Sequence, residues 1–412
     1  MVASQTLANF DGMMKQRYPS WKILQLMYTD RPFMALLPKD ETFFGSAMKI
    51  PLWYGNSQNV SSTFSVANAG ASQESVDAFL LTRKKNYGTF SIANEVIEAS
   101  AKDPGAFMAA LESNVEGALN AISNDINYQL WGTGTGKLSK IKAATSPGLT
   151  VTLNDPAESV YFEKGMYIYT STADGGGSTK TACQITKVNR STGVLTMAAD
   201  VSGGGYSWAA SDYIFRSGNY DQVISGVQAW VPYDDRTAKL AASFYGVTRN
   251  YDDYRLGGLI YDGSGTIEEQ LTDALVLAGR EGANVDHIFM NPYDMGSLIK
   301  ALGSKVQYMQ VSADIKEDGN VRAVVGFDGI QIYTTKGKAK VLADRGVPLG
   351  RAFALELNTW KLCSLNKLIR MFDADGLTTL RLSDDDGVSG RFVSYGNLST
   401  NAPGKNMQIK LY

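Results

Sequence analysis

Histidine and cysteine, the side chains most used for catalysis and metal binding, are nearly absent from this sequence. Its 412 residues include one histidine, His287, and two cysteines, Cys183 and Cys363. One histidine excludes a multi-histidine metal site, and two cysteines far apart in the sequence exclude a Cys-rich zinc module and a disulfide framework. The two cysteines are most simply buried small apolar residues.

Charge is sparse and nearly balanced. Charged residues make up 19% of the chain, and 39 basic against 41 acidic residues leave a net charge of −2. This balance argues against a strongly basic nucleic-acid-binding protein, and the 44% of hydrophobic residues argues against a disordered chain. No apolar run approaches the ~18 residues of a membrane span, and residues 1–15 lack the pattern of a signal peptide. We therefore expect a soluble protein made in the cytoplasm.

Several patterns that suggest chemistry do not fit the motifs they resemble. The run Gly132–Lys137 would be a phosphate-binding loop only with glycine at position 131 and serine or threonine at 138, where the sequence has tryptophan and leucine. His287 is a lone histidine in an apolar strand, and no G-x-S-x-G motif accompanies it. The acidic turns 373–376 and 384–387 lack the ligand spacing of a calcium loop. We expect no catalytic residue, no metal and no cofactor.

The clearest predicted element is a helix over residues 103–131. Asp103 and Pro104 suit its N-cap and first helical position. Apolar residues recur at helical spacing from Phe107 to Leu130, and Gly132 ends the pattern. At 1.5 Å per residue the helix is roughly 40 Å long, and it contains no Lys or Arg. We expect a spine with an acidic polar face.

Strand patterns follow this helix. Residues 149–216 read as short strands between Gly-rich turns, which predicts a small all-β barrel or sandwich inserted into the chain. Residues 220–365 mix helices and strands, with a capping box formed by Thr266 and Glu269. Residues 366–412 return to strands.

Two segments at the start of the sequence cannot bury their apolar residues alone. Residues 1–45 form a proline-interrupted arm, which packs either on its own domain or on something else. Residues 46–95 predict a long two-stranded ribbon with a polar tip, and an isolated ribbon of this kind is only marginally stable in water. The ribbon is therefore expected to be mobile or to be held by a neighbouring chain.

The order of these parts resembles the Johnson fold, the Hong Kong 97 type fold of major capsid proteins in tailed bacteriophages. The matching motifs are Lys49–Leu52, Tyr87–Glu95, Asp103–Pro104, Ile224–Val227, His287–Pro292 and Val347–Leu355. Each motif is degenerate alone, and their order and spacing over nearly the whole chain carry the resemblance. The β segment 149–216 departs from the family's minimal form, although some members carry an insertion in a comparable place.

The resemblance implies an α+β capsid fold. The expected parts are an N-terminal arm (1–45), an extended β-hairpin loop (46–95), a peripheral domain with the spine helix (96–147), an inserted small all-β domain (148–218), an axial α/β domain (219–365) and further peripheral strands (366–412). It also implies a non-enzymatic virion protein that self-assembles into hexamers and pentamers of an icosahedral head around double-stranded DNA. The implied partners are other copies of the chain, a scaffolding protein, a portal protein, a decoration protein and DNA contacted non-specifically, with no membrane.

The densest basic run lies on the return limb of the predicted ribbon. It consists of Arg83, Lys84 and Lys85. A solvated face is one interpretation, and docking on acidic groups of an adjacent subunit is the other. The candidate acidic groups are Glu112, Glu116, Asp384, Asp385 and Asp386. Exposed pairs contribute under ~1 kcal/mol each, but a shell would repeat them at every subunit.

Two other functions stay open at this point. An encapsulin-type nanocompartment shares the fold and packages cargo enzymes. A carbohydrate-binding tail or adhesin protein would use the Gly- and Tyr-rich β segment, where Tyr206, Trp208 and Tyr213 could stack on sugars. Such aromatic residues are more often part of a core.

Overall fold

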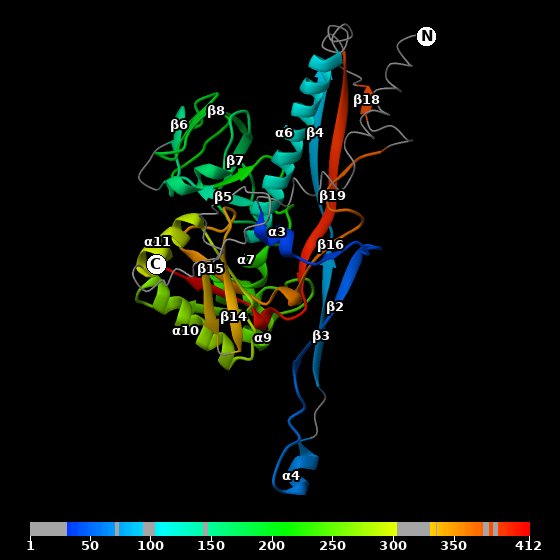
Figure 1. The fold of residues 1–412 in the computed structure, drawn as a ribbon, viewed down its shortest axis with the longest axis vertical. Helices are drawn as coiled ribbons and strands as arrows, with labels where there is room; N and C mark the ends of the chain where they lie inside the picture. The colour runs from blue at the N-terminus through cyan, green and yellow to red at the C-terminus, as the bar shows by residue number, and fades with distance from the viewer. Residues whose placement is uncertain are drawn as a thin grey trace, which may run out of the picture.

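A computed structural model describes residues 31–70, 74–93, 104–142, 147–302, 330–334, 336–373, 379–381 and 386–412, with side chains of the first long helix described from residue 115 onward. Figure 1 shows a tall layer of helix and strands, a β body and an α/β body beside it, and a long ribbon projecting away from all of them.

The tall layer is built on the predicted spine. Helix α6 (Pro104–Trp131) forms as expected and runs beside β4 (Lys84–Ala93) and β19 (Gly387–Thr400) (Figure 1). These two strands pair in one antiparallel ladder from Gly387↔Ala93 to Gly396↔Lys84. The remaining strands of this peripheral sheet are β1 (Lys39–Asp40), β16 (Trp360–Ser364), β17 (Arg370–Met371) and β18 (Thr379–Arg381).

The ribbon is shorter than the sequence predicts. Its strands are β2 (Ala47–Gly55) and β3 (Ser75–Thr82), which pair only with each other, and its tip carries helix α4 (Phe64–Ala69). The expected return limb ran on to residue 95, whereas β4 belongs to the peripheral sheet. The reason is that Phe90 and Ile92 are buried in the cluster that contains the spine residues Ile122 and Ile126, which a free ribbon cannot provide.

The strand pairing also corrects two of the predicted domain boundaries near the end of the chain. Strand β16 lies in the peripheral sheet, beside β19, rather than in the axial domain. Strand β20 (Met407–Lys410) lies in the axial sheet, between β11 (Leu259–Asp262) and β15 (Arg351–Leu355), rather than in the peripheral domain. Each domain is therefore assembled from segments that are far apart in the sequence.

The axial body is a six-stranded mixed sheet covered on one face by helices. Its strand order is β11-β20-β15-β12-β14-β13, where β12 is His287–Met290, β14 is Gly337–Ala343 and β13 is Ile330–Thr334. Alternate residues of β12 serve two cores: Ile288 packs with helix α10 (Ile267–Arg280), and Phe289 packs with Trp131 at the end of the spine. The capping box of Thr266 and Glu269 is confirmed at the start of α10. Helix α11 (Pro292–Leu302) follows β12.

The inserted β domain is a small barrel. Its strands are β5 (Lys137–Lys140), β6 (Thr150–Thr152), β7 (Tyr167–Ser171), β8 (Cys183–Asn189), β9 (Val194–Met197) and β10 (Tyr213–Arg216), in the order β5-β10-β7-β8-β9-β6. A bridge between Ile141 and Leu153 joins the two edges and closes the barrel. The domain begins at residue 137 rather than at 148, because β5 pairs with β10. Chain entry and exit therefore lie side by side.

The centre of the molecule is an aromatic core where these bodies meet. Helix α3 (Pro32–Leu36) buries Phe33 against Trp131, with ring centroids 4.3 Å apart. Residues 31–45 of the expected arm thus pack on their own chain, and residues 1–30 lie outside the described residues. The other short helices are α7 (Val227–Trp230), α8 (Arg236–Ala241), η2 (Arg249–Tyr251), α9 (Asp253–Gly257), η4 (Leu357–Thr359) and η5 (Pro403–Lys405).

Candidate assembly surfaces and the joint between domains

The root of the ribbon is fixed to its own chain. Ile50, Leu52, Phe79 and Leu81 are buried in the central core. The backbone N–H of Leu80 donates to the carbonyl of Tyr245 at 2.8 Å. These contacts hold the inner half of the ribbon at one angle to the body.

The outer half of the ribbon exposes large apolar side chains. Val60 is 91% exposed, Phe64 is 84% exposed and Trp53 is 65% exposed. Helix α4 buries none of its residues. Single exposed apolar residues are ordinary, but a group of this size on one projection marks an interaction surface.

The structure gives two members of the basic run partners within their own chain. Arg83 donates from Nη1 to the carbonyl of Phe43 at 2.8 Å and stacks over the ring of that residue. Lys84 donates from Nζ to the carbonyl of Asp221 at 2.8 Å, and burial lowers the pKa of its ammonium. Lys85 is exposed. Of the run, Lys85 alone presents an exposed side chain.

The acidic candidates are placed only in part. Glu116 is half-buried on the spine helix, and Asp386 is exposed just before β19. The side chain of Glu112 and all of Asp384 and Asp385 lie outside the described residues. The predicted pairing with an adjacent subunit therefore stays a prediction.

Charge is nevertheless divided between the two layers of the peripheral domain. The sequence of α6 contains acidic residues and no Lys or Arg, whereas β4, β17, β18 and β19 contain Lys or Arg and no acid. One described acid of the helix is used internally: Asp125 accepts from Arg216 of the inserted domain at 3.1 Å. This ion pair holds the barrel against the spine.

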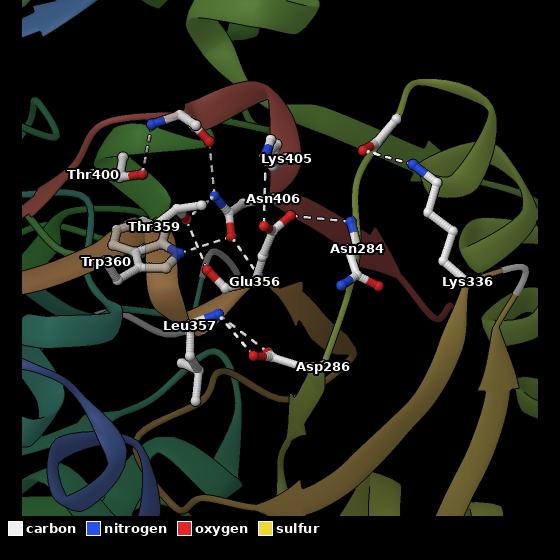
Figure 2. Close-up of polar contacts among 12 residues, drawn as sticks. Asn284, Asp286, Lys336, Glu356, Leu357, Thr359, Trp360, Thr400, Lys405 and Asn406 are labelled. Atoms are coloured by element: carbon white, nitrogen blue, oxygen red, sulfur yellow. Dashed lines mark hydrogen bonds and ion pairs between the residues drawn. The ribbon is translucent and has the colours of Figure 1, made fainter.

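The peripheral and axial domains are joined by two chain crossings that lie side by side (Figure 2). One crossing runs from β15 through η4 to β16, and the other runs from β19 through η5 to β20. A buried carboxylate connects them to the axial body: Glu356 accepts from the backbone N–H of Asn284 at 3.0 Å and from Nζ of Lys405 at 3.4 Å. Asp286 accepts from the backbone N–H of Leu357 at 3.1 Å.

Asn406 is the centre of this joint. It is fully buried, and its Oδ1 accepts from the backbone N–H of Glu356 at 3.0 Å and from Nε1 of Trp360 at 2.7 Å. Its Nδ2 donates to Oγ1 of Thr359 and to the carbonyl of Ala402, both at 3.0 Å. One side chain thus bonds both crossings with all of its polar atoms.

Sequence reasoning missed this network. The only local signal was the Pro403-Gly404 turn before the last strand, and a lone asparagine carries no motif. Its role follows from pairing between segments that are far apart in the chain.

The patterns that suggested chemistry have structural partners. Lys137 of the Gly-rich run forms an ion pair with Asp174 at 3.1 Å. His287 lies on β12, with Nδ1 3.1 Å from the Asp286 carboxylate. Cys183 and Cys363 are free and buried, as expected. Trp208 lies in the barrel core and donates from Nε1 to the carbonyl of Thr181 at 3.0 Å, so it is not a sugar platform.

Within the described part of the chain, no group of three or more His, Cys, Asp or Glu residues is placed to hold a metal ion. Across the same residues, no helix combines the length and apolar character needed to cross a bilayer.

Comparisons with known proteins identify the fold. A capsid chain of cyanophage A-1(L) matches with a TM-score of 0.52 and 13% sequence identity over 93% of both chains. Chains from Mycobacterium phage Ogopogo (TM-score 0.43, 8% identity, 92% of both chains) and from the virus-like particle of Pyrococcus furiosus (TM-score 0.38, 8% identity, 94% of this chain and 96% of that one) match less well. No protein-family model and no curated protein matches the sequence. The chain therefore has a mixed α/β phage-capsid fold of the Hong Kong 97 type.

Proposed function

We propose that this chain is the major capsid protein of a tailed bacteriophage. It assembles into hexamers and pentamers of an icosahedral head that encloses double-stranded DNA, and it has no enzymatic role. A scaffolding protein, a portal protein and a decoration protein are the proposed partners besides other copies of the chain.

The observation that carries this proposal is the exposed apolar tip of the ribbon. Val60 and Phe64 are exposed in the described part of the chain, while the root of the same ribbon is buried and hydrogen-bonded. A second copy of the chain covers them when each ribbon lies on its neighbour. Because the ribbon and the surface it contacts are different parts of the subunit, such heterologous contacts repeat around an axis and close into rings.

The test replaces the apolar tip without disturbing the fold. A variant with Val60→Ser and Phe64→Ser should remain folded, because substitutions of exposed residues change stability by about 0.5 kcal/mol or less. The same variant should lose assembled particles in electron micrographs and in mass measurements. Val276→Ser is the control, since Val276 is also exposed but lies on helix α10 of the axial body rather than on the ribbon. Wild-type particle yield from the tip variant would contradict the proposal.

A separate test concerns the basic run. We propose that Lys85 pairs with an acidic group of the adjacent subunit, such as Glu112, Glu116 or the turn Asp384–Asp386. Lys85→Glu should reduce assembly at low salt and have little effect at high salt, because salt screens exposed pairs. Lys187→Glu on the inserted barrel makes the same charge change at another exposed position. Equal particle yield for wild type and Lys85→Glu at all salt concentrations would refute this role.

The contents of the particle separate the two shell functions. A phage head contains long double-stranded DNA, whereas an encapsulin-type compartment contains a cargo protein. Nuclease-protected DNA recovered from particles produced in infected cells supports the capsid function. Particles that hold a single enzyme and no protected DNA would favour the nanocompartment.

A further inference from the structure

The end of the spine helix packs on a loop of the axial domain. Asn127 and Trp131 lie one turn apart on α6, and the loop that follows β14 supplies Asp344 and Gly346. Oδ1 of Asp344 accepts from Nδ2 of Asn127 at 3.0 Å and from the backbone N–H of Gly346 at 2.8 Å. These two bonds fix the carboxylate of the axial loop against the helix.

Three polar atoms at this contact have no hydrogen-bond partner among the described residues. They are Nε1 of Trp131, Oδ1 of Asn127 and Oδ2 of Asp344. The three residues are 0%, 1% and 2% exposed, respectively, so bulk solvent does not reach them. A buried polar group without a partner is destabilising. Three such atoms on neighbouring side chains therefore indicate a bound ligand.

Gly346 shows how close these three side chains lie to one another. A Cβ on this glycine would lie 2.7 Å from Nδ2 of Asn127 and 2.7 Å from Cδ1 of Trp131. Cδ1 is bonded to Nε1 within the indole ring, and Nδ2 shares its carbon atom with Oδ1 of the same amide. Oδ2 of Asp344 belongs to the carboxylate that accepts from the backbone N–H of Gly346. The three unpartnered atoms thus belong to groups that surround one glycine.

The indole N–H of Trp131 differs from those of the other described tryptophans. Nε1 of Trp53, Trp208 and Trp230 donates to backbone carbonyls at 3.0–3.1 Å, and Nε1 of Trp360 donates to a side-chain amide oxygen at 2.7 Å. Among these described tryptophans, Trp131 alone has no protein acceptor. The acceptor for its N–H is therefore a group that is not part of the protein.

We propose that Trp131, Asn127 and Asp344 bind one internal water molecule that joins the spine helix to the axial loop. The water oxygen accepts from the indole N–H of Trp131, and the two water hydrogens are donated to Oδ1 of Asn127 and Oδ2 of Asp344. Buried waters typically make about three hydrogen bonds to polar groups of this kind. A cation does not fit the same site, because the indole nitrogen is only a donor and would direct its hydrogen at the ion.

The inference concerns the single chain and does not depend on the proposed function. The experiment is NMR of the full unassembled chain, deuterated and labelled with ¹⁵N-tryptophan, in which magnetisation is transferred from water to the indole protons. Trp131 should show a water cross peak of opposite sign in NOE and ROE spectra, the signature of a long-lived bound water. Trp208, Trp230 and Trp360 are the matched controls, because they are buried and bonded to the protein, and they should show no such peak.

A structure of the wild-type chain at a resolution that shows ordered water is the second measurement and needs no variant. It should contain one peak of density within hydrogen-bond distance of all three atoms. The peak of Trp131 in the NMR spectrum is assigned by its loss in Trp131→Phe. Absence of the water cross peak at Trp131, or of the density, would overturn the proposal.

Asp344→Asn separates a water from a cation. The new amide should keep its oxygen on the two donors that now hold Oδ1, which turns its NH₂ toward the site. A water can accept from this group, so the cross peak at Trp131 should remain, whereas a cation would be expelled. Loss of the cross peak in the folded variant, or density that changes when sodium is replaced by rubidium, would contradict a water site.

Discussion

The joint between the two domains can be tested by removing its central side chain. In Asn406→Ala, the backbone N–H of Glu356 and Nε1 of Trp360 lose their acceptor, and the carbonyl of Ala402 loses its donor. The site is fully buried, so water cannot replace these bonds without a structural change. Each buried donor left without a partner costs about 1–3 kcal/mol.

These losses predict a destabilisation of about 3–5 kcal/mol, near the upper end of what single substitutions cause. For a cooperative unit of 150–250 residues this corresponds to a fall in Tm of roughly 6–20 °C. Thermal unfolding followed by tryptophan fluorescence is the appropriate assay, because Trp360 is itself a member of the network.

The matched control is Asn401→Ala. Asn401 is exposed in the same crossing, and only its backbone N–H is bonded, to the carbonyl of Thr359 at 3.2 Å. Its replacement should change stability by about 0.5 kcal/mol or less. An Asn406→Ala variant that unfolds within about 1 kcal/mol of the wild type would refute the claim that this network holds the joint.

Three further predictions concern the unassembled chain, each read by urea or thermal unfolding. Gly390→Ala should destabilise it by about 1–3 kcal/mol, because a Cβ there would lie 2.2 Å from the ring of Phe90. Gly117→Ala should stabilise it by about 0.5–1 kcal/mol, since among the described residues nothing outside the neighbouring backbone of its own helix lies within 4 Å of that Cβ, and glycine weakens a helix interior. Tyr412→Phe should destabilise it by about 1 kcal/mol at pH 7 and by less at pH 4, because burial raises the pKa of Asp294 and the lost hydroxyl bond favours its ionised form.

Local patterns predicted the spine and the capped helix because their signals are contained in single segments. Asp103, Pro104 and the apolar spacing up to Leu130 need no distant partner to indicate a helix. The same holds for the capping box at Thr266. Elements whose stability comes from nearby residues could therefore be predicted from the sequence.

The predicted assignment of strands to the ribbon and to the sheets was wrong for the opposite reason. Residues 84–93 continue the alternation of the ribbon, and nothing local shows that their partner is β19, near the other end of the chain. The sequence also does not indicate the limits of β19, because its Gly- and Ser-rich ends have low β propensity. They are ordered in the structure by strands on both sides, including β4 and β16. The pairing partners of these residues, rather than their local β propensity, determine that they form a strand and to which sheet they belong.

The basic run shows at the level of side chains that the local sequence does not reveal which distant segment a residue contacts. Arg83 and Lys84 look like a solvated or docking patch in the sequence, and both instead bond to carbonyls of segments that the fold brings close. A long cationic side chain can cover apolar surface and reach such a carbonyl, so its role depends on what the fold places beside it.

The root of the ribbon shows how a contact at the tip acts on the whole subunit. Asn397 on β19 is fully buried, and its Nδ2 donates to the carbonyl of Thr82 on the ribbon and to the hydroxyl of Tyr245, both at 2.8 Å. Its Oδ1 accepts from the backbone N–H of Ser225 at 3.0 Å. A fully bonded buried network of this kind resists distortion, so the proposed contact of a neighbouring copy with Phe64 would leave the angle of the root unchanged. The direction in which the ribbon leaves the body is therefore set within the single chain.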